Sequence, residues 1–180
     1  MKTGLLTFHA AHHYGAQLQA YALMRAICDT GAEGEIIDYV RQDTERAKHL
    51  FRKMHTVVDV VANLHTLLHL TPLRRRTERF ERFVKEQMRL SPQSYGTYAE
   101  LEENPPVYDA YVCGSDQIWN PLIFREQDFD PAFFAAFAKS GKKIAYAPSF
   151  GLPDMPMAHH AALRTLVSDF AALSVRERNG

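Results

Sequence analysis

Four short polar segments of the 180-residue chain contain the residue types that could do chemistry: residues 9–19, 114–120, 148–151 and 176–178. Each is rich in Gly, Ser, Asp, Asn, His or Arg, and each follows an apolar run that predicts a buried strand. In an open parallel sheet, ligands bind beyond the carboxyl ends of the strands. We therefore expect the four segments to meet at one edge of a sheet and to form a site there.

The most specific segment is Gly-Ser-Asp-Gln-Ile-Trp-Asn at residues 114–120. Gly114 and Ser115 allow a ligand to approach the backbone closely, and Asp116 offers a carboxylate that could accept a proton from a hydroxyl group. The only tryptophan, Trp119, could give a sugar ring an apolar face to stack on. The alternative is that Asp116 caps the next short helix and that Trp119 lies in the core.

The segment at residues 9–19 places Tyr14 and Gly15 at the start of a predicted helix. Free backbone N–H groups and the helix dipole make such a start a natural anion site. A single glycine is not a dinucleotide motif, and the alternative is a tight turn in which Gly15 gives backbone clearance. Three histidines also lie here, His9, His12 and His13. They have no acidic or cysteine partner nearby in sequence, so we predict no metal site.

The elements that must position these segments alternate between strands and helices. Apolar runs predict strands near residues 3–8, 35–40, 108–113, 143–147 and 171–175. Apolar side chains at helical spacing predict a helix between the first two strands and another after Pro156. The strands lack polar alternation, which indicates burial on both faces. The predicted fold class is α/β, a Rossmann-like doubly wound parallel sheet.

Residues 42–104 interrupt this alternation. Two amphipathic helices separated by Thr71-Pro72 predict mostly helical structure from residue 44 to residue 91. We interpret residues 42–104 as a helical insertion that covers one edge or face of the sheet. The second helix has a basic run, Arg74, Arg75, Arg76, Arg79 and Arg82, interleaved with acidic residues. We expect a solvated, partly ion-paired face, and contact with an anionic polysaccharide is the alternative.

Composition excludes several classes of protein. Lys+Arg and Asp+Glu both number 21, so the overall charge gives no argument for a nucleic-acid partner or an anionic membrane. The most apolar stretch, residues 56–70, is broken by polar residues, so we predict no transmembrane segment. The cysteines Cys28 and Cys113 have no metal-type spacing and suit reduced thiols. We expect a cytoplasmic protein.

Four motifs together resemble one known family. HHYGAQLQAYAL, GSDQIWNP, KKIAYAPSFG and LSVRERNG, in this order and spacing, resemble the polysaccharide pyruvyl transferases, and the likeness runs from Lys2 to Gly180. His13 stands where many members of this subgroup have Asn. The resemblance implies a two-domain fold like that of the GT-B glycosyltransferases, with the active site in the cleft between the halves. This chain would be the N-terminal half, residues 1–180, with the C-terminal domain absent.

The resemblance also implies a reaction. A carboxyethylidene group would pass from phosphoenolpyruvate to two hydroxyls of a sugar, with no nucleotide cofactor. Asp116 is the candidate base, and Arg176 matches a family motif as a donor ligand, with an ion pair to Glu177 as its alternative. The predicted substrate-binding residues are His13, Tyr14, Gly15, Gln19, Gly114, Ser115, Gln117, Trp119, Asn120, Ser149 and Arg176.

The expected partners are the small-molecule donor, the saccharide acceptor and the missing C-terminal domain or partner chain. We expect this chain alone to be inactive, because a cleft enzyme with one wall cannot hold both substrates or exclude water. Two alternatives remain open: a glycosyltransferase domain that uses a nucleotide sugar, and a non-catalytic, truncated or sugar-binding module.

Overall fold

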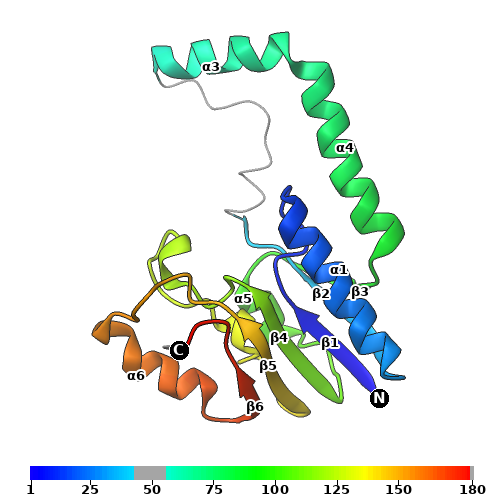
Figure 1. Ribbon diagram of the computed structural model, residues 1–180, viewed down its shortest axis with the longest axis vertical. Coiled ribbons are helices and arrows are strands. Elements are labelled where there is room, and N and C mark those ends of the chain that lie inside the picture. The colour runs from blue at the N-terminus through cyan, green and yellow to red at the C-terminus, as the bar shows by residue number, and fades with distance from the viewer. Residues whose placement is uncertain (43–55, 179–180) are drawn as a thin grey trace.

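The computed structural model describes residues 1–42 and 56–178, and a six-stranded sheet runs through it (Figure 1). The strands lie in the order β3-β2-β1-β4-β5-β6, and each neighbouring pair is parallel. Their bounds are β1 Lys2–Leu6, β2 Glu33–Tyr39, β3 Leu90–Tyr95, β4 Ala110–Asp116, β5 Lys142–Pro148 and β6 Phe170–Ser174. The strand order and the parallel pairing confirm the predicted Rossmann-like doubly wound sheet.

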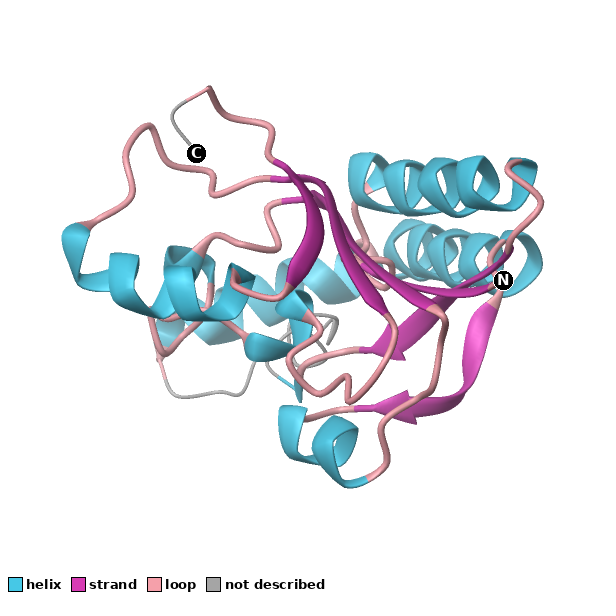
Figure 2. Ribbon diagram, turned by 90° about the horizontal axis from the view of Figure 1, so that it is seen from below, coloured by secondary structure: helices cyan, strands magenta, loops and turns pink. Residues whose placement is uncertain are grey.

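Helices cover both faces of the sheet (Figure 2). The long helices α1 (Tyr14–Asp29) and α4 (Leu70–Gln87) lie on one face, where Ala20 and Met24 of α1 pack with Leu5, Ile36 and Val112 of the strands. The other face is covered by α5 (Tyr98–Glu103), by α6 (Met157–Val167) and by two short 3-10 helices, η1 (Pro121–Ile123) and η2 (Pro131–Phe134). The core on this face is mainly aromatic.

Strands β1 and β4 lie side by side, and the chain leaves them toward opposite faces. After β1 it forms α1 on one face, and after β4 it forms η1 and η2 on the other. Such a switch point opens a crevice beyond the strand ends, where doubly wound proteins bind ligands. The segments singled out for chemistry at residues 9–19 and 114–120 therefore border this crevice.

The predicted helical insertion is wrong in one part. Helices α3 (Val57–Leu68) and α4 confirm helical structure between residues 57 and 87, while the predicted part from residue 44 to residue 55 lies outside the described residues. Residues 42–104 also contain strand β3 and helix α5. Strand β3 pairs with β2 at the edge of the sheet, where Pro92 is tolerated because an edge strand does not need every N–H group. Helices α3 and α4 thus belong to the connection between two neighbouring strands.

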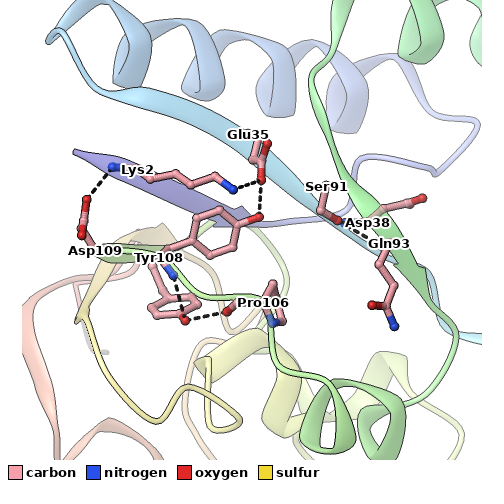
Figure 3. A network of polar contacts seen from close by, with 9 residues as sticks. Lys2, Glu35, Asp38, Ser91, Gln93, Pro106, Tyr108 and Asp109 are labelled. Carbon is pink, nitrogen blue, oxygen red and sulfur yellow. Dashed lines mark hydrogen bonds and ion pairs between the residues drawn. The ribbon is translucent and has the colours of Figure 1, made fainter.

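A polar network joins the amino ends of three strands, at the edge opposite the crevice (Figure 3). The Tyr108 hydroxyl donates to Glu35 Oε1 at 2.6 Å, and Lys2 Nζ lies 3.2 Å from the same oxygen. Burial, together with the hydrogen bond to Glu35, raises the pKa of Tyr108 far above its usual value. A Cβ at Gly4 would lie 2.6 Å from the Tyr108 ring, so only glycine leaves room for this network.

Within residues 1–42 and 56–178, no helix is both long enough and apolar enough to cross a bilayer.

Candidate functional site

Hydrogen bonds tie together the carboxyl ends of β1, β4 and β5. Thr7 Oγ1 lies 3.1 Å from Gln19 Oε1 of α1 and 3.2 Å from the carbonyl oxygen of Ser115. Ser115 Oγ in turn donates to the carbonyl oxygen of Ala147 at 3.2 Å. The residues predicted to converge therefore include a connected set, Gln19 and Ser115, that is held across the switch point.

Gln19 has an unused polar atom at this position. The single hydroxyl hydrogen of Thr7 cannot serve both Gln19 and Ser115, but turning the amide over would let Gln19 donate to Thr7 while Thr7 donates to Ser115. As the amide stands, Nε2 of Gln19 is buried and has no partner among the residues that the structure describes. A buried amide atom without a partner costs free energy.

Asp116 sits at the end of β4 in an unusual backbone conformation. Its φ of 78° lies in the left-handed region, which non-glycine residues rarely adopt outside turns and functional sites. Its Oδ1 accepts a hydrogen bond from Gln117 N at 2.8 Å, and its carbonyl oxygen accepts one from Ser149 N at 2.8 Å. The half-buried carboxylate is thus held by its own turn, and within the described part of the chain Oδ2 has no hydrogen bond.

The next short helix takes its cap from a different residue. Asn120 Oδ1 accepts from Leu122 N at 3.0 Å at the start of η1. The alternative interpretation of Asp116 as the cap of that helix therefore does not describe this structure. Its carboxylate stays available at the rim.

Arg176, just beyond β6, has an exposed side chain. Its backbone N donates to the carbonyl oxygen of Pro148 at 3.2 Å, which fixes the chain beside the end of β5. Among the residues placed by the structure, no carboxylate lies within ion-pair distance of its guanidinium, so the alternative of an ion pair with Glu177 does not hold here. A guanidinium without a protein partner at this edge is suited to an anionic ligand.

Glu177 holds the turn at residues 149–151. Its carboxylate accepts hydrogen bonds from Ser149 Oγ, from Phe150 N at 3.3 Å and from Gly151 N at 3.4 Å. Burial raises the pKa of Glu177, but these hydrogen bonds lower it by more, so that the pKa lies below its usual value. Sequence reasoning missed this role, because Glu177 stood out there only as the neighbour of Arg176.

Trp119 requires a correction. Only 1% of it is exposed, its ring stacks on Phe134 at 4.6 Å, and Nε1 donates to the carbonyl oxygen of Phe133 at 3.0 Å. The expectation that Trp119 offers a sugar ring an apolar face is therefore wrong, and the alternative, a core tryptophan, is right.

Several other predicted substrate-binding residues join loops to each other. Asn120 Nδ2 donates to Gln117 Oε1 at 3.2 Å, and both amides pack against Gly151, where a Cβ would lie 2.5 Å from Asn120. Gly114 and Ser149 are buried, and a Cβ at Gly114 would lie 2.2 Å from a carbonyl oxygen of β5. These residues lock the loop after β4 to the loop after β5, and so they position Asp116.

The start of α1 explains the unusual histidine. His13 is the N-cap, and its Nδ1 accepts from Ala16 N at 3.3 Å. Asn is a preferred N-cap because its side-chain oxygen accepts the same bond, so histidine keeps the acceptor that the helix needs. Gly15 lies against the His13 ring, and the exposed Tyr14 ring lies 4.7 Å from that of Phe80 in α4.

A buried histidine–carboxylate pair lies beside this region. His9 is 1% exposed, and its Nε2 lies 2.9 Å from Oδ1 of Asp38 in β2. Sequence reasoning missed the pair because the two residues are 29 positions apart, and only the pairing of β1 with β2 brings them together. The described residues contain no cluster of three or more His, Cys, Asp or Glu side chains that could hold a metal ion.

His9 also lines two cavities. One, of about 460 Å³, lies past the ends of β1 and β2, and its lining includes four aromatic rings, from Phe8, Tyr39, Phe124 and Phe133, together with Arg41 and Arg125. The second, of about 500 Å³, extends toward β3 and α4. Asp116 and Arg176 line neither of these two cavities.

One of three comparisons with known proteins gives a match. Neither a search of curated proteins nor a search of solved structures gives a significant match. The family model described as polysaccharide pyruvyl transferase matches residues 13–180, which span α1 and the loops that carry Asp116, Ser149 and Arg176. The chain belongs to the polysaccharide pyruvyl transferase family.

Proposed function

We propose that this chain forms one wall of an active site that transfers a pyruvyl group from phosphoenolpyruvate to a saccharide as a cyclic ketal. The observation that supports it best is that two complementary groups occur at one rim. They are a carboxylate on Asp116 with one oxygen that has no hydrogen bond among the described residues, and a guanidinium on Arg176 that has no ion pair there. The family match gives the general class, a transferase acting on polysaccharide.

The chemistry needs both kinds of group. Phosphoenolpyruvate gains a proton at its methylene carbon, and two acceptor hydroxyls form C–O bonds to C2 while the bond to the phosphate oxygen breaks. One hydroxyl proton balances the new methyl group, and the other leaves with phosphate. A base must therefore take a proton from an attacking hydroxyl, and cations must stabilise the charge on the donor carboxylate and phosphate.

We assign these tasks as follows. Asp116 is the base, because its Oδ1 is held by the turn and its Oδ2 can meet an acceptor hydroxyl. Arg176 binds the anionic donor, and we assign to the first backbone N–H groups of α1 a second contact with it. Gln19 supports this wall through its hydrogen bond with Thr7.

A second domain of a GT-B-like arrangement would complete the cleft. We assign to it the acid that protonates the methylene carbon and further cations for the donor. The reaction requires no nucleotide cofactor, because the transferred group and the leaving phosphate both come from the donor. We place the reaction in the cytoplasm, which agrees with the free thiols of Cys28 and Cys113.

The test is a donor comparison in a two-domain protein that contains this chain. With phosphoenolpyruvate and a saccharide acceptor, we expect phosphate release and a new ketal methyl signal by proton NMR in equal amounts. The chain of residues 1–180 alone should give neither at a comparable rate. Transfer from a nucleotide sugar, with none from phosphoenolpyruvate, would refute the proposal in favour of a glycosyltransferase.

A further inference from the structure

Helix α3 turns its apolar side away from the protein. The side chains at Val60, Val61, Leu64, Leu67 and Leu68 follow the spacing of one helical stripe, and each is more than half exposed, with Leu68 at 74%. The polar side of the same helix, with Asp59, Asn63 and Thr66, is only partly exposed. A helix of a globular protein normally has the opposite orientation, so this stripe requires a partner.

Basic side chains follow the stripe along the chain. Arg74, Arg75, Arg79 and Arg82 are exposed in α4, which begins where α3 ends. None of them makes an ion pair with another residue described by the structure, so the expected partly ion-paired face is not seen there. Arg74 and Arg75 lie in the first turns of α4, six and seven residues after Leu68, the last residue of the stripe.

We propose that α3 and the first turns of α4 bind the surface of a bilayer that contains anionic lipids. The stripe from Val60 to Leu68 would enter the boundary between headgroups and acyl chains, and Arg74 and Arg75 would contact the headgroups. An apolar helical face next to arginines is the arrangement that interfacial helices use. The net charge of the whole chain does not indicate this local basic segment, because the 21 basic and 21 acidic residues balance.

The geometry favours a bilayer over a second copy of the chain. A 12-residue helix is about 18 Å long, so its stripe is much smaller than the roughly 800 Å² per partner that a stable dimer buries. Figure 1 shows α3 lying beyond the end of the sheet at which β1 and β4 finish. A bilayer at α3 would therefore lie on the same side of the protein as the candidate site. The inference does not rest on the proposed function.

The experiment is co-sedimentation of the 180-residue chain with vesicles. We expect tighter binding to phosphatidylcholine mixed with phosphatidylglycerol than to phosphatidylcholine alone, and weaker binding to the anionic vesicles as salt is raised. Leu64→Ala with Leu68→Ala removes apolar area while keeping good helix formers, and should weaken binding at least about tenfold. Arg74→Gln with Arg75→Gln should weaken binding to the anionic vesicles by about fivefold per arginine.

Matched controls lie elsewhere on the surface. Val107 is 72% exposed in a loop and Arg25 is exposed on α1, so Val107→Gln and Arg25→Gln should leave binding unchanged. Absence of binding to both kinds of vesicle would overturn the inference, as would an equal loss in the controls. Self-association that the double leucine variant abolishes, without vesicle binding, would show instead that a second copy covers the stripe.

Discussion

Replacing Trp119 with phenylalanine tests whether the most specific motif serves the core or the substrate. The change removes the N–H that donates to the carbonyl oxygen of Phe133 at 3.0 Å. A buried carbonyl that loses its partner costs about 1–3 kcal/mol, and the smaller ring leaves a void worth about 1 kcal/mol more. We therefore expect Trp119→Phe to lower the free energy of unfolding by about 2–4 kcal/mol. For a domain of this size, the Tm should fall by roughly 5–15 °C.

The assay is urea unfolding followed by circular dichroism, with Tyr146→Phe as the control. Tyr146 is 56% exposed, so its substitution should change the stability by no more than about 0.5 kcal/mol. In the unsubstituted chain, Trp119 is the only tryptophan, so its fluorescence reports on this position alone. We expect blue-shifted emission that iodide hardly quenches until the chain unfolds.

Two results would refute this reasoning. Stability equal to that of the unsubstituted chain would mean that the hydrogen bond to the carbonyl oxygen of Phe133 contributes nothing. Strong quenching of the Trp119 fluorescence by iodide in the folded chain would show that Trp119 is exposed. Protection from that quenching by a saccharide would show that Trp119 contacts the sugar.

Three further predictions concern single positions. Gly151→Ala should lower the Tm by more than Gly31→Ala. Both glycines have a positive φ, but only at Gly151 would a Cβ meet other atoms, at 2.5 Å from Asn120. Equal losses of Tm would contradict the importance of this contact. Burial and a hydrogen bond to Glu102 raise the pKa of Tyr98 to about 12, so its contribution to stability is complete below about pH 10 and is lost as pH rises toward 12. Tyr98→Phe should flatten that decline in urea unfolding between these pH values, and an unchanged slope would contradict it. The pKa of Glu177 is lowered, so its contribution to stability is present above about pH 4.3 and is lost as the pH falls. The difference in Tm between Glu177→Gln and the unsubstituted chain should therefore vanish in acid. A difference that stays constant with pH would contradict this prediction.

The sequence could predict most of the sheet because five strands are short apolar runs. The sixth strand, β3, could not be found this way. Its residues Leu-Ser-Pro-Gln-Ser-Tyr do not alternate clearly, include a proline, and lie at an edge where one side needs no pairing. Only the pairing with β2 makes this segment a strand, and pairing partners far apart in the chain leave no local signal.

The position of the site could be predicted better than the roles of its residues. The rule that ligands bind past the strand ends led to Gln19, Ser115 and Asp116, which the structure places at the switch point. Sequence reasoning could not separate Asp116 from Trp119, because burial depends on which side of a loop packs on the sheet. The partners of His9 and Glu177 are set by the tertiary fold, so their types and local spacing gave no signal.

The most direct test of the account is the turnover of a two-domain protein that contains this chain, with Asp116 or with Asp116→Asn. We expect the variant to fold normally by circular dichroism, and to form the ketal roughly 10²–10⁴-fold more slowly, the range for loss of a general base. Its affinity for phosphoenolpyruvate should change little, because the proposed mechanism has the carboxylate facing the acceptor hydroxyls. A folded variant with near-normal turnover would contradict the assignment of Asp116 as the base.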